Sequence, residues 1–215
     1  MYKEAIRSVW AEINLTNADY NIKQIKKKVG EDKEIIGVLK ADGYGHGAVK
    51  MAEVLRENGV KSFAVATLQE CIALREAGAM EEIIMLGLTP DIYADTIVQY
   101  NITPTVNSWE NAKAFSDEAK NNGVEVRGFV AVDTGMGRIG YLPDDERAIG
   151  DIKKMEKLSN FSVKGLLSHF ARADEKDKSF SEVQVKLYED FERKLNDAGV
   201  EILFKSIANS AAIME

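Results

Sequence analysis

Short apolar runs alternate with longer segments of helical periodicity along most of this chain. Between the runs, apolar residues recur at the spacing of a helix face, and several of these segments end in glycine, as helices commonly do. Such alternation is typical of parallel βαβ units. The runs that we predict to be strands are residues 35–39, 62–66, 82–87, 101–106, 125–132, 161–167 and 201–207.

One further run, VWAEINL at residues 9–15, alternates apolar and polar positions and predicts a strand with an exposed face in a different sheet. We therefore expect residues 16–215 to form a TIM-type (β/α)8 barrel, with the strand of residues 1–15 outside it. The barrel is expected to be incomplete, because seven strands are predicted and 215 residues fall short of the usual length of about 250. An open doubly wound sheet is the alternative, which counting strands does not exclude.

Composition and charge narrow the class of protein. The chain is 45% hydrophobic and 29% charged, as expected of a globular domain. Its net charge is −7 and its basic residues are scattered, so nucleic acid is not an expected partner. The one cysteine, Cys71, reads as a small core residue. No apolar run is long enough to span a membrane and no signal peptide is recognisable, so we expect a cytoplasmic protein.

Polar segments follow several of the predicted strands, where a parallel α/β protein builds its active site. They are Lys40–Gly47, Asp133–Gly140, Ser168–Phe170 and Asn209–Ser210.

Lys40 directly follows the apolar run at 35–39. Burying an ammonium group is unfavourable unless the group is paired or its pKa falls, and a lysine of depressed pKa is a nucleophile that forms imines with carbonyl compounds. An ordinary lysine reaching solvent from a strand end is the competing interpretation. The following ADGYGHG favours a ligand site, because Gly43 and its neighbouring glycines allow positive φ and Tyr44 offers a phenol to an anion. His46 fits a role in binding loop carbonyls equally well.

The segment DTGMGRIG has the G-x-G-x-x-G spacing of a dinucleotide site but not its context. The next helix is predicted to begin near 143–144, after Gly140, and the next strand ends in Ser-His rather than an acid. We interpret the glycines as shaping a loop that presents Arg138 to a ligand oxygen, with Asp133 orienting the loop or pairing with a cation.

Two further candidates are weak when taken singly. His169 follows the sixth strand, and a lone histidine there is more often structural than catalytic. Asn209 or Ser210 could cap a helix whose free amides receive a phosphate, although an ordinary cap is the simpler interpretation.

Taken in order, RSVWAEINL, LKADGYGHG, VDTGMGRIG, SHFARAD and IANSAA resemble the N-terminal barrel of the bacterial alanine racemases. The resemblance implies a pyridoxal 5′-phosphate (PLP) enzyme of fold type III that interconverts L- and D-alanine, the latter a cell-wall precursor. It also implies a head-to-tail homodimer with a separate C-terminal β-domain, and no metal.

The resemblance also implies roles for single residues. Lys40 would form the aldimine with PLP and act as one of two bases at Cα. Tyr44 and Ser210, with Asn209 beside it, would bind the cofactor phosphate. Arg138 would contact the phenolic oxygen and the substrate carboxylate, and His169 would join the polar network beside the ring.

Parts of the family pattern are missing or altered. The second base, a tyrosine of the partner subunit, and the arginine facing the pyridine nitrogen would both fall beyond Glu215. Ala131 stands where many relatives have a lysine, often carbamylated, that orients the arginine, and Ser206 stands where many have a histidine.

Three alternatives accompany the racemase hypothesis. The first is a PLP-binding protein or fragment without turnover, and the second is the racemase domain of a larger serine or alanine racemase with a membrane part elsewhere. The third, a type III decarboxylase, is disfavoured because its phosphate-binding glycines are not recognisable.

Overall fold

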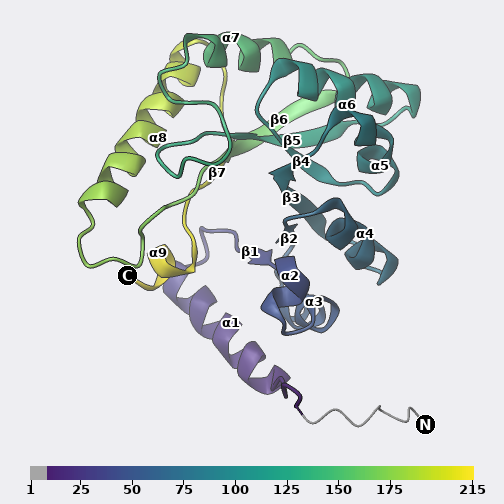
Figure 1. Ribbon diagram of the computed structural model, residues 1–215, viewed down its shortest axis with the longest axis vertical. Helices are drawn as coiled ribbons and strands as arrows, with labels where there is room; N and C mark the ends of the chain where they lie inside the picture. Colours follow the sequence, from purple (N-terminus) through teal and green to yellow (C-terminus); the bar gives the residue numbers. More distant parts are fainter. Residues whose placement is uncertain (1–8) are drawn as a thin grey trace.

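Residues 9–215 are described by a computed structural model, in which seven strands form one parallel sheet. The strands pair in the order in which they occur in the chain, from β1 to β7. A doubly wound sheet would reverse its order part-way, so that alternative is excluded. The sheet curls around its own axis, and the predicted incomplete barrel is confirmed (Figure 1). The strands are β1 (Ile36–Val38), β2 (Ser62–Val65), β3 (Glu82–Leu88), β4 (Thr103–Val106), β5 (Val126–Ala131), β6 (Phe161–Leu167) and β7 (Phe204–Ser206).

Helices follow the strands and cover the outer, convex side of the curled sheet (Figure 1). Four of the longer ones end two residues before a glycine with positive φ, as predicted from the sequence. The helices are α1 (Leu15–Val29), α2 (Lys40–Tyr44), α3 (Ala48–Glu57), α4 (Leu68–Glu76), the 3-10 turn η1 (Asp91–Tyr93), α5 (Ala94–Gln99), α6 (Trp109–Asn121), α7 (Glu146–Met155), α8 (Ser179–Asp197) and α9 (Ser210–Met214).

The strands β2, β4 and β5 bury most of their side chains on both faces, as expected inside a parallel sheet, whereas the edge strands β1 and β7 are partly exposed. On β2, Phe63 and Val65 point outward into the main core beneath the helices, whereas Ala64 points inward. Ala64 packs with Ile84 and Phe129 in a small second core on the concave side. Two cores separated by one sheet are the arrangement expected of a barrel wall.

The amino-terminal end of the barrel contains a buried ion pair. Lys164 of β6 lies 2.5 Å from Glu82 at the start of β3, and each side chain is only 13% exposed. The carboxylate of Glu82 also accepts hydrogen bonds from Ser62 and Thr103, at the starts of β2 and β4. The ammonium group of Lys164 lies 4.7 Å from the centroid of the Phe204 ring. We call this group of residues the floor cluster.

The strand predicted at residues 9–15 is not formed. Residues 9–14 have no regular structure, Trp10 is exposed, and Leu15 begins α1. Asn14 caps that helix by accepting a hydrogen bond from the backbone N–H of Asn17. An isolated strand is not stable, and this segment has no strand partner among residues 9–215, so its alternating pattern does not suffice. Residues 1–8 of the predicted N-terminal segment lie outside the described residues.

Candidate active site at the carboxyl ends of the strands

The polar segments that follow the strands meet at one end of the sheet. Lys40, Asp133 and His169 each lie two residues beyond a strand, after β1, β5 and β6, and Asn209 follows β7. Because the strands are parallel, these positions share the carboxyl rim of the barrel. The structure thus brings the predicted site residues to one rim.

Lys40 opens a left-handed turn. The φ angles of Ala41, Asp42, Gly43 and Tyr44 are 52°, 52°, 61° and 56°, although the sequence predicted positive φ only at glycines. Left-handed geometry costs an L-residue about 1–2 kcal/mol, so other contacts must hold this turn. The Lys40 side chain is half-buried, and its Nζ atom lies 5.8 Å from the centroid of the exposed Tyr44 ring.

Carboxylates hold the left-handed turn from outside. Glu70 of α4 accepts hydrogen bonds from the backbone N–H groups of Ala41 at 2.6 Å, Ala66 at 2.8 Å and Thr67 at 3.0 Å. Burial raises the pKa of Glu70, but these N–H groups lower it by more, so its pKa lies below the ordinary value. Asp42 similarly accepts from the N–H of Ala48 at 2.8 Å.

His46 completes the turn from within. Its Nδ1 atom lies 3.0 Å from the carbonyl oxygen of Gly43 and 3.2 Å from that of Tyr44. This is the local role, binding loop carbonyls, that the sequence left open for it.

Asp133 orients the loop that carries Arg138. Its carboxylate accepts hydrogen bonds from the backbone N–H groups of Gly135, Gly137 and Arg138 at 2.8–3.0 Å. Burial raises the pKa of Asp133, but these bonds lower it by more, and the net pKa lies below the ordinary value. Of the two roles considered for Asp133, the structure therefore shows loop orientation, and the exposed Arg138 side chain is left free to bind a ligand.

The same loop shows why Gly140 is required. Its φ is +117°, and a Cβ atom there would lie 2.7 Å from the carbonyl carbon of Ala131. The loop continues to Tyr141, which bonds back to the end of β5, and α7 begins only at Glu146 with Asp145 as its cap. The glycines therefore shape a loop rather than a dinucleotide site, and the helix starts slightly later than predicted.

His169 is half-buried near two cationic side chains, Arg138 and Lys40. Its pKa is lowered chiefly by burial and further by the positive charges of Arg138 and Lys40. The imidazole is therefore neutral near pH 7. Within residues 9–215, neither Lys40 nor Arg138 has an acidic side chain within ion-pair distance. Although the whole chain is acidic, the rim around these two residues therefore offers positive charge to an anion.

Asn209 and Ser210 adopt different positions at the start of α9. Asn209 is the cap, accepting from the N–H of Ala212 at 3.1 Å and contacting the carbonyl oxygen of Phe170 at 3.5 Å. Ser210 is the first residue of the helix and is exposed. The cap interpretation therefore holds for Asn209, whereas the hydroxyl of Ser210 remains available to a ligand.

The two residues that depart from the family pattern both lie at the rim. Ala131 is buried at the end of β5, and the carbonyl oxygen of Ser206 accepts a hydrogen bond from the N–H of Ser168 at 2.8 Å. Position 131 carries only a methyl group, and Asp133 binds the backbone N–H of Arg138. At position 206 the contact with Ser168 is made by the backbone carbonyl.

Sequence reasoning missed two residues that support this rim, Glu70 and Gln184. Thr67-x-x-Glu70 has the spacing of a capping box, and the box is present. The capping-box spacing could have placed Glu70 at the start of a helix. It could not have predicted the hydrogen bond from Ala41 to Glu70, because that bond depends on the pairing of β1 with β2. Gln184 is fully buried on α8 and gave no motif.

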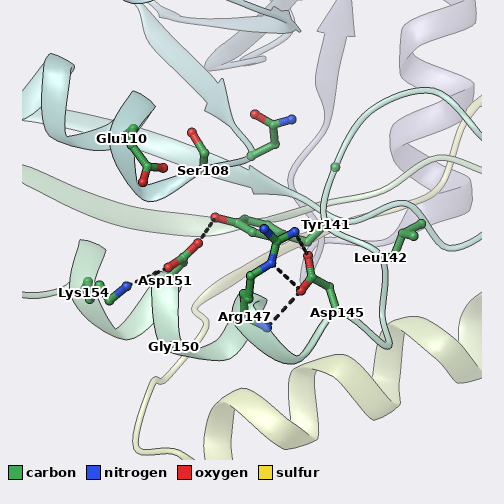
Figure 2. A pocket seen from close by; sticks show the side chains of 11 residues that line it. Ser108, Glu110, Tyr141, Leu142, Asp145, Arg147, Gly150, Asp151 and Lys154 are labelled. Carbon is green, nitrogen blue, oxygen red and sulfur yellow. Dashed lines mark hydrogen bonds and ion pairs between the residues drawn. The ribbon is translucent and has the colours of Figure 1, made fainter.

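A separate depression of about 620 Å³ lies on the outer surface, between the starts of α6 and α7 (Figure 2). Four of its five charged residues pair with one another, Asp145 with Arg147 and Asp151 with Lys154, and Glu110 is the fifth. The hydroxyl of Tyr141 lies 3.4 Å from Asp151, and burial followed by that charge raises the Tyr141 pKa. The lining includes none of the predicted site residues, so we assign the depression no part in catalysis.

In residues 9–215, no group of three or more His, Cys, Asp or Glu side chains could hold a metal ion. Nor does this part of the chain contain a helix long and apolar enough to cross a membrane.

Comparison with known proteins identifies the family of this chain. The family described as "Alanine racemase, N-terminal domain" matches residues 13–215. Alanine racemase 1 of Clostridium acetobutylicum is 45% identical over 98% of this chain and 54% of its own length. The alanine racemase of Clostridium tetani is 46% identical over the whole chain and 55% of its own length. This chain thus spans about half the length of these relatives.

Solved structures agree with the sequence relatives. The alanine racemase of Clostridium difficile 630 superposes with a TM-score of 0.94 at 41% identity, over 99% of this chain and 55% of its own. That of Bacillus anthracis, described with bound L-Ala-P, superposes with a TM-score of 0.90 at 30% identity, over 98% of this chain and 54% of its own. Sequence and structure together place this chain in the alanine racemase family, as its N-terminal, PLP-binding barrel domain.

Proposed function

We propose that the protein to which this barrel belongs is a PLP-dependent amino-acid racemase, an isomerase that interconverts L- and D-alanine. The observation that carries the proposal is the arrangement of Lys40, Arg138 and His169 on one rim, with no acidic side chain of residues 9–215 paired to either cation. An amine, a guanidinium and a neutral imidazole suit a ligand that is anionic and carries an aldehyde.

The residues present fit PLP. Lys40, half-buried at the rim, would supply the amine that binds the aldehyde carbon. Tyr44 and Ser210, both exposed at the rim, would bind the phosphate, with Asn209 holding the start of α9. Arg138 would bind the phenolic oxygen of the cofactor and the carboxylate of the substrate.

When bound, PLP withdraws electrons from the substrate Cα and makes its proton removable. Lys40 then removes or returns that proton on one face of Cα as a general base or acid. His169, kept neutral, hydrogen-bonds beside the ring without adding a third positive charge to the site.

Racemisation requires a second base on the opposite face of Cα, and Lys40 can serve one face only. We propose that the second base is a tyrosine from the C-terminal domain of the partner subunit, as the family resemblance implies. A head-to-tail homodimer, a cytoplasmic location and the association of residues 1–15 with the C-terminal β-domain belong to the same proposal.

Alanine is the proposed substrate because relatives that are 45% and 46% identical to this chain are named alanine racemases. A histidine racemase from Leuconostoc mesenteroides also superposes, with a TM-score of 0.84 at 29% identity. The barrel is therefore compatible with other amino acids, and serine remains the alternative substrate of a larger racemase. A second candidate function, PLP binding without turnover by this chain, is favoured by the presence of one base where two are needed.

The test is to incubate the full-length protein and this chain with PLP, reduce with borohydride and locate the adduct by mass spectrometry. The adduct is expected on Lys40 in both, and conversion of L-alanine to D-alanine only in the full-length protein. An adduct absent from the folded full-length protein would refute the PLP assignment. Racemisation by this chain alone would refute the second base outside it.

A further inference from the structure

Helix α8 carries a polar side chain in the middle of its buried face. Gln184, Tyr188, Phe191 and Leu195 are all buried, at the spacing of one helix stripe facing the barrel. Gln184 is 0% exposed. A buried amide is unfavourable unless its donors and its acceptor are bonded, so its partners explain its presence.

The amide of Gln184 bonds to two loops of the rim at once. Its Nε2 atom donates to the hydroxyl oxygen of Thr134 at 3.1 Å and to the carbonyl oxygen of His169 at 2.9 Å. Its Oε1 atom accepts from the backbone N–H of Ala171 at 3.0 Å. Both donor hydrogens and the oxygen are therefore used.

A second bond closes the network between the loops. The hydroxyl groups of Thr134 and Ser168 lie 2.9 Å apart, and both residues are buried. Thr134 adjoins Asp133, which holds the N–H of Arg138, and Ser168 adjoins His169. Hydrogen bonds therefore link Gln184 to both candidate site residues through a few atoms of backbone.

We infer that Gln184 is a positioning residue, which locks the loop that carries Arg138 to the loop that carries His169 and so fixes the distance between these two side chains. Its relevance to catalysis rests on the proposed function, in which both side chains contact the cofactor. The locking itself is a property of this chain and can be measured without the cofactor.

Tyr188 provides a matched control on the same helix. It lies one turn after Gln184, is 5% exposed, and its hydroxyl donates to the carbonyl oxygen of Leu166 at 3.0 Å. That partner lies within β6 rather than in a rim loop. Tyr188→Phe therefore removes a buried hydrogen bond between α8 and the barrel while leaving the three hydrogen bonds of Gln184 in place.

The experiment compares Gln184→Met, Gln184→Glu and Tyr188→Phe in the cofactor-free chain by amide hydrogen exchange and by NMR titration. The chain has two histidines, His46 and His169. A variant without His46 identifies the His169 signal, and in all other samples the His46 signal is the internal reference. In Gln184→Met, exchange at residues 135–138 and 169–171 is expected to accelerate about tenfold or more. The His169 pKa is expected to rise toward its ordinary value as Arg138 moves away and water enters.

Gln184→Glu keeps the side-chain shape and the acceptor for Ala171, and Thr134 can donate to it, but it sets a carboxylate oxygen against the His169 carbonyl oxygen in place of a hydrogen bond. Its change in exchange should be greatest at 169–171, and it serves if the methionine variant does not fold. Tyr188→Phe should leave both loops and the His169 titration unchanged. Equal effects of Gln184→Met and Tyr188→Phe, or unchanged loops in both Gln184 variants, would overturn the inference.

The link to function is read separately in the full-length protein. PLP is titrated against Gln184→Met and Tyr188→Phe, with the yield of the borohydride-reduced adduct on Lys40 as the signal. About tenfold weaker binding is expected in Gln184→Met alone, by the loss of preorganisation. If the unsubstituted protein forms no adduct, the proposed function fails, while the exchange and titration data still decide the role of Gln184. If Gln184→Met and Tyr188→Phe bind PLP with equal affinity, the hydrogen bonds of Gln184 do not contribute to cofactor binding.

Discussion

The two ends of the barrel both gather charged side chains, but only one end neutralises them. In the floor cluster, Lys164 is paired with Glu82, whose carboxylate also accepts from two hydroxyl groups. At the rim, Lys40 and Arg138 have no acidic partner among residues 9–215, and the nearby Asp133 binds backbone N–H groups instead. A satisfied buried pair is a structural element, whereas unpaired cations over a strained turn imply a ligand.

The largest effect on stability is expected from breaking the floor cluster. Lys164→Met leaves the carboxylate of Glu82 buried without its counter-ion, which should lower the free energy of unfolding by about 3–5 kcal/mol in urea denaturation. Lys205→Met is the control, because the pair of Lys205 with Glu192 is half exposed on the lysine side and should contribute at most about 1 kcal/mol. Similar losses in the two variants would show that the floor pair is not effectively buried.

The rim loop should be the next most sensitive region, for steric rather than electrostatic reasons. Gly140→Ala places a methyl group against the backbone of Ala131 at positive φ and should cost about 2–3 kcal/mol. Gly137→Ala has φ +72° but meets no atom within 4 Å, so it should cost only about 1 kcal/mol. Equal losses in thermal denaturation would contradict the close approach at Gly140.

The rim carboxylates should make stability sensitive to acid. The pKa values of Glu70 and Asp133 are lowered in the folded chain, so their stabilisation is present above the pKa of the unfolded chain, near 4, and is lost as pH falls through the folded values. Urea denaturation from pH 6 to pH 3 should show a falling free energy of unfolding. Asp133→Asn should have a lower free energy of unfolding than the unsubstituted protein at pH 6, and this free energy should fall less between pH 6 and pH 3. An equal dependence of the free energy of unfolding on pH in the two proteins would refute this.

The smallest change in stability is expected for substitution of Lys40, which should abolish the PLP adduct completely. Lys40→Met leaves no acid unpaired, so the free energy of unfolding should change by less than about 1 kcal/mol, while the reducible PLP adduct disappears. This contrast with Lys164→Met is the direct test of the difference between the two ends. A loss as large as at the floor would mean that Lys40 is structural.

Alternation of short apolar runs with segments of helical period was sufficient to predict the seven strands, including the partly exposed edge strands β1 and β7. It failed at residues 9–15, where an alternating pattern has no strand beside it and Asn14 instead caps α1. Parallel topology was likewise enough to place Lys40, Asp133 and His169 on one rim. It could not predict that Ala41, Asp42 and Tyr44 would take positive φ, since nothing in their side chains requires it.

The supporting residues escaped prediction for a related reason. Glu70 and Gln184 act through backbone groups, and a backbone N–H or carbonyl leaves no trace in the sequence. Their partners are brought near only by the packing of α4 on β1 and β2, and of α8 on the loops after β5 and β6. The side chains proposed to contact a ligand therefore lie in recognisable motifs, whereas those that hold the motifs in place were visible only in the fold.

The strand order has a consequence for the synthesis of the chain. Because β1 to β7 pair in the order in which they are made, each βα unit can dock on the one before it as it leaves the ribosome. The Lys164–Glu82 contact joins residues 82 positions apart and can form only after six strands have emerged. Closure of the floor would then be a late step of folding, after the curled wall is already in place.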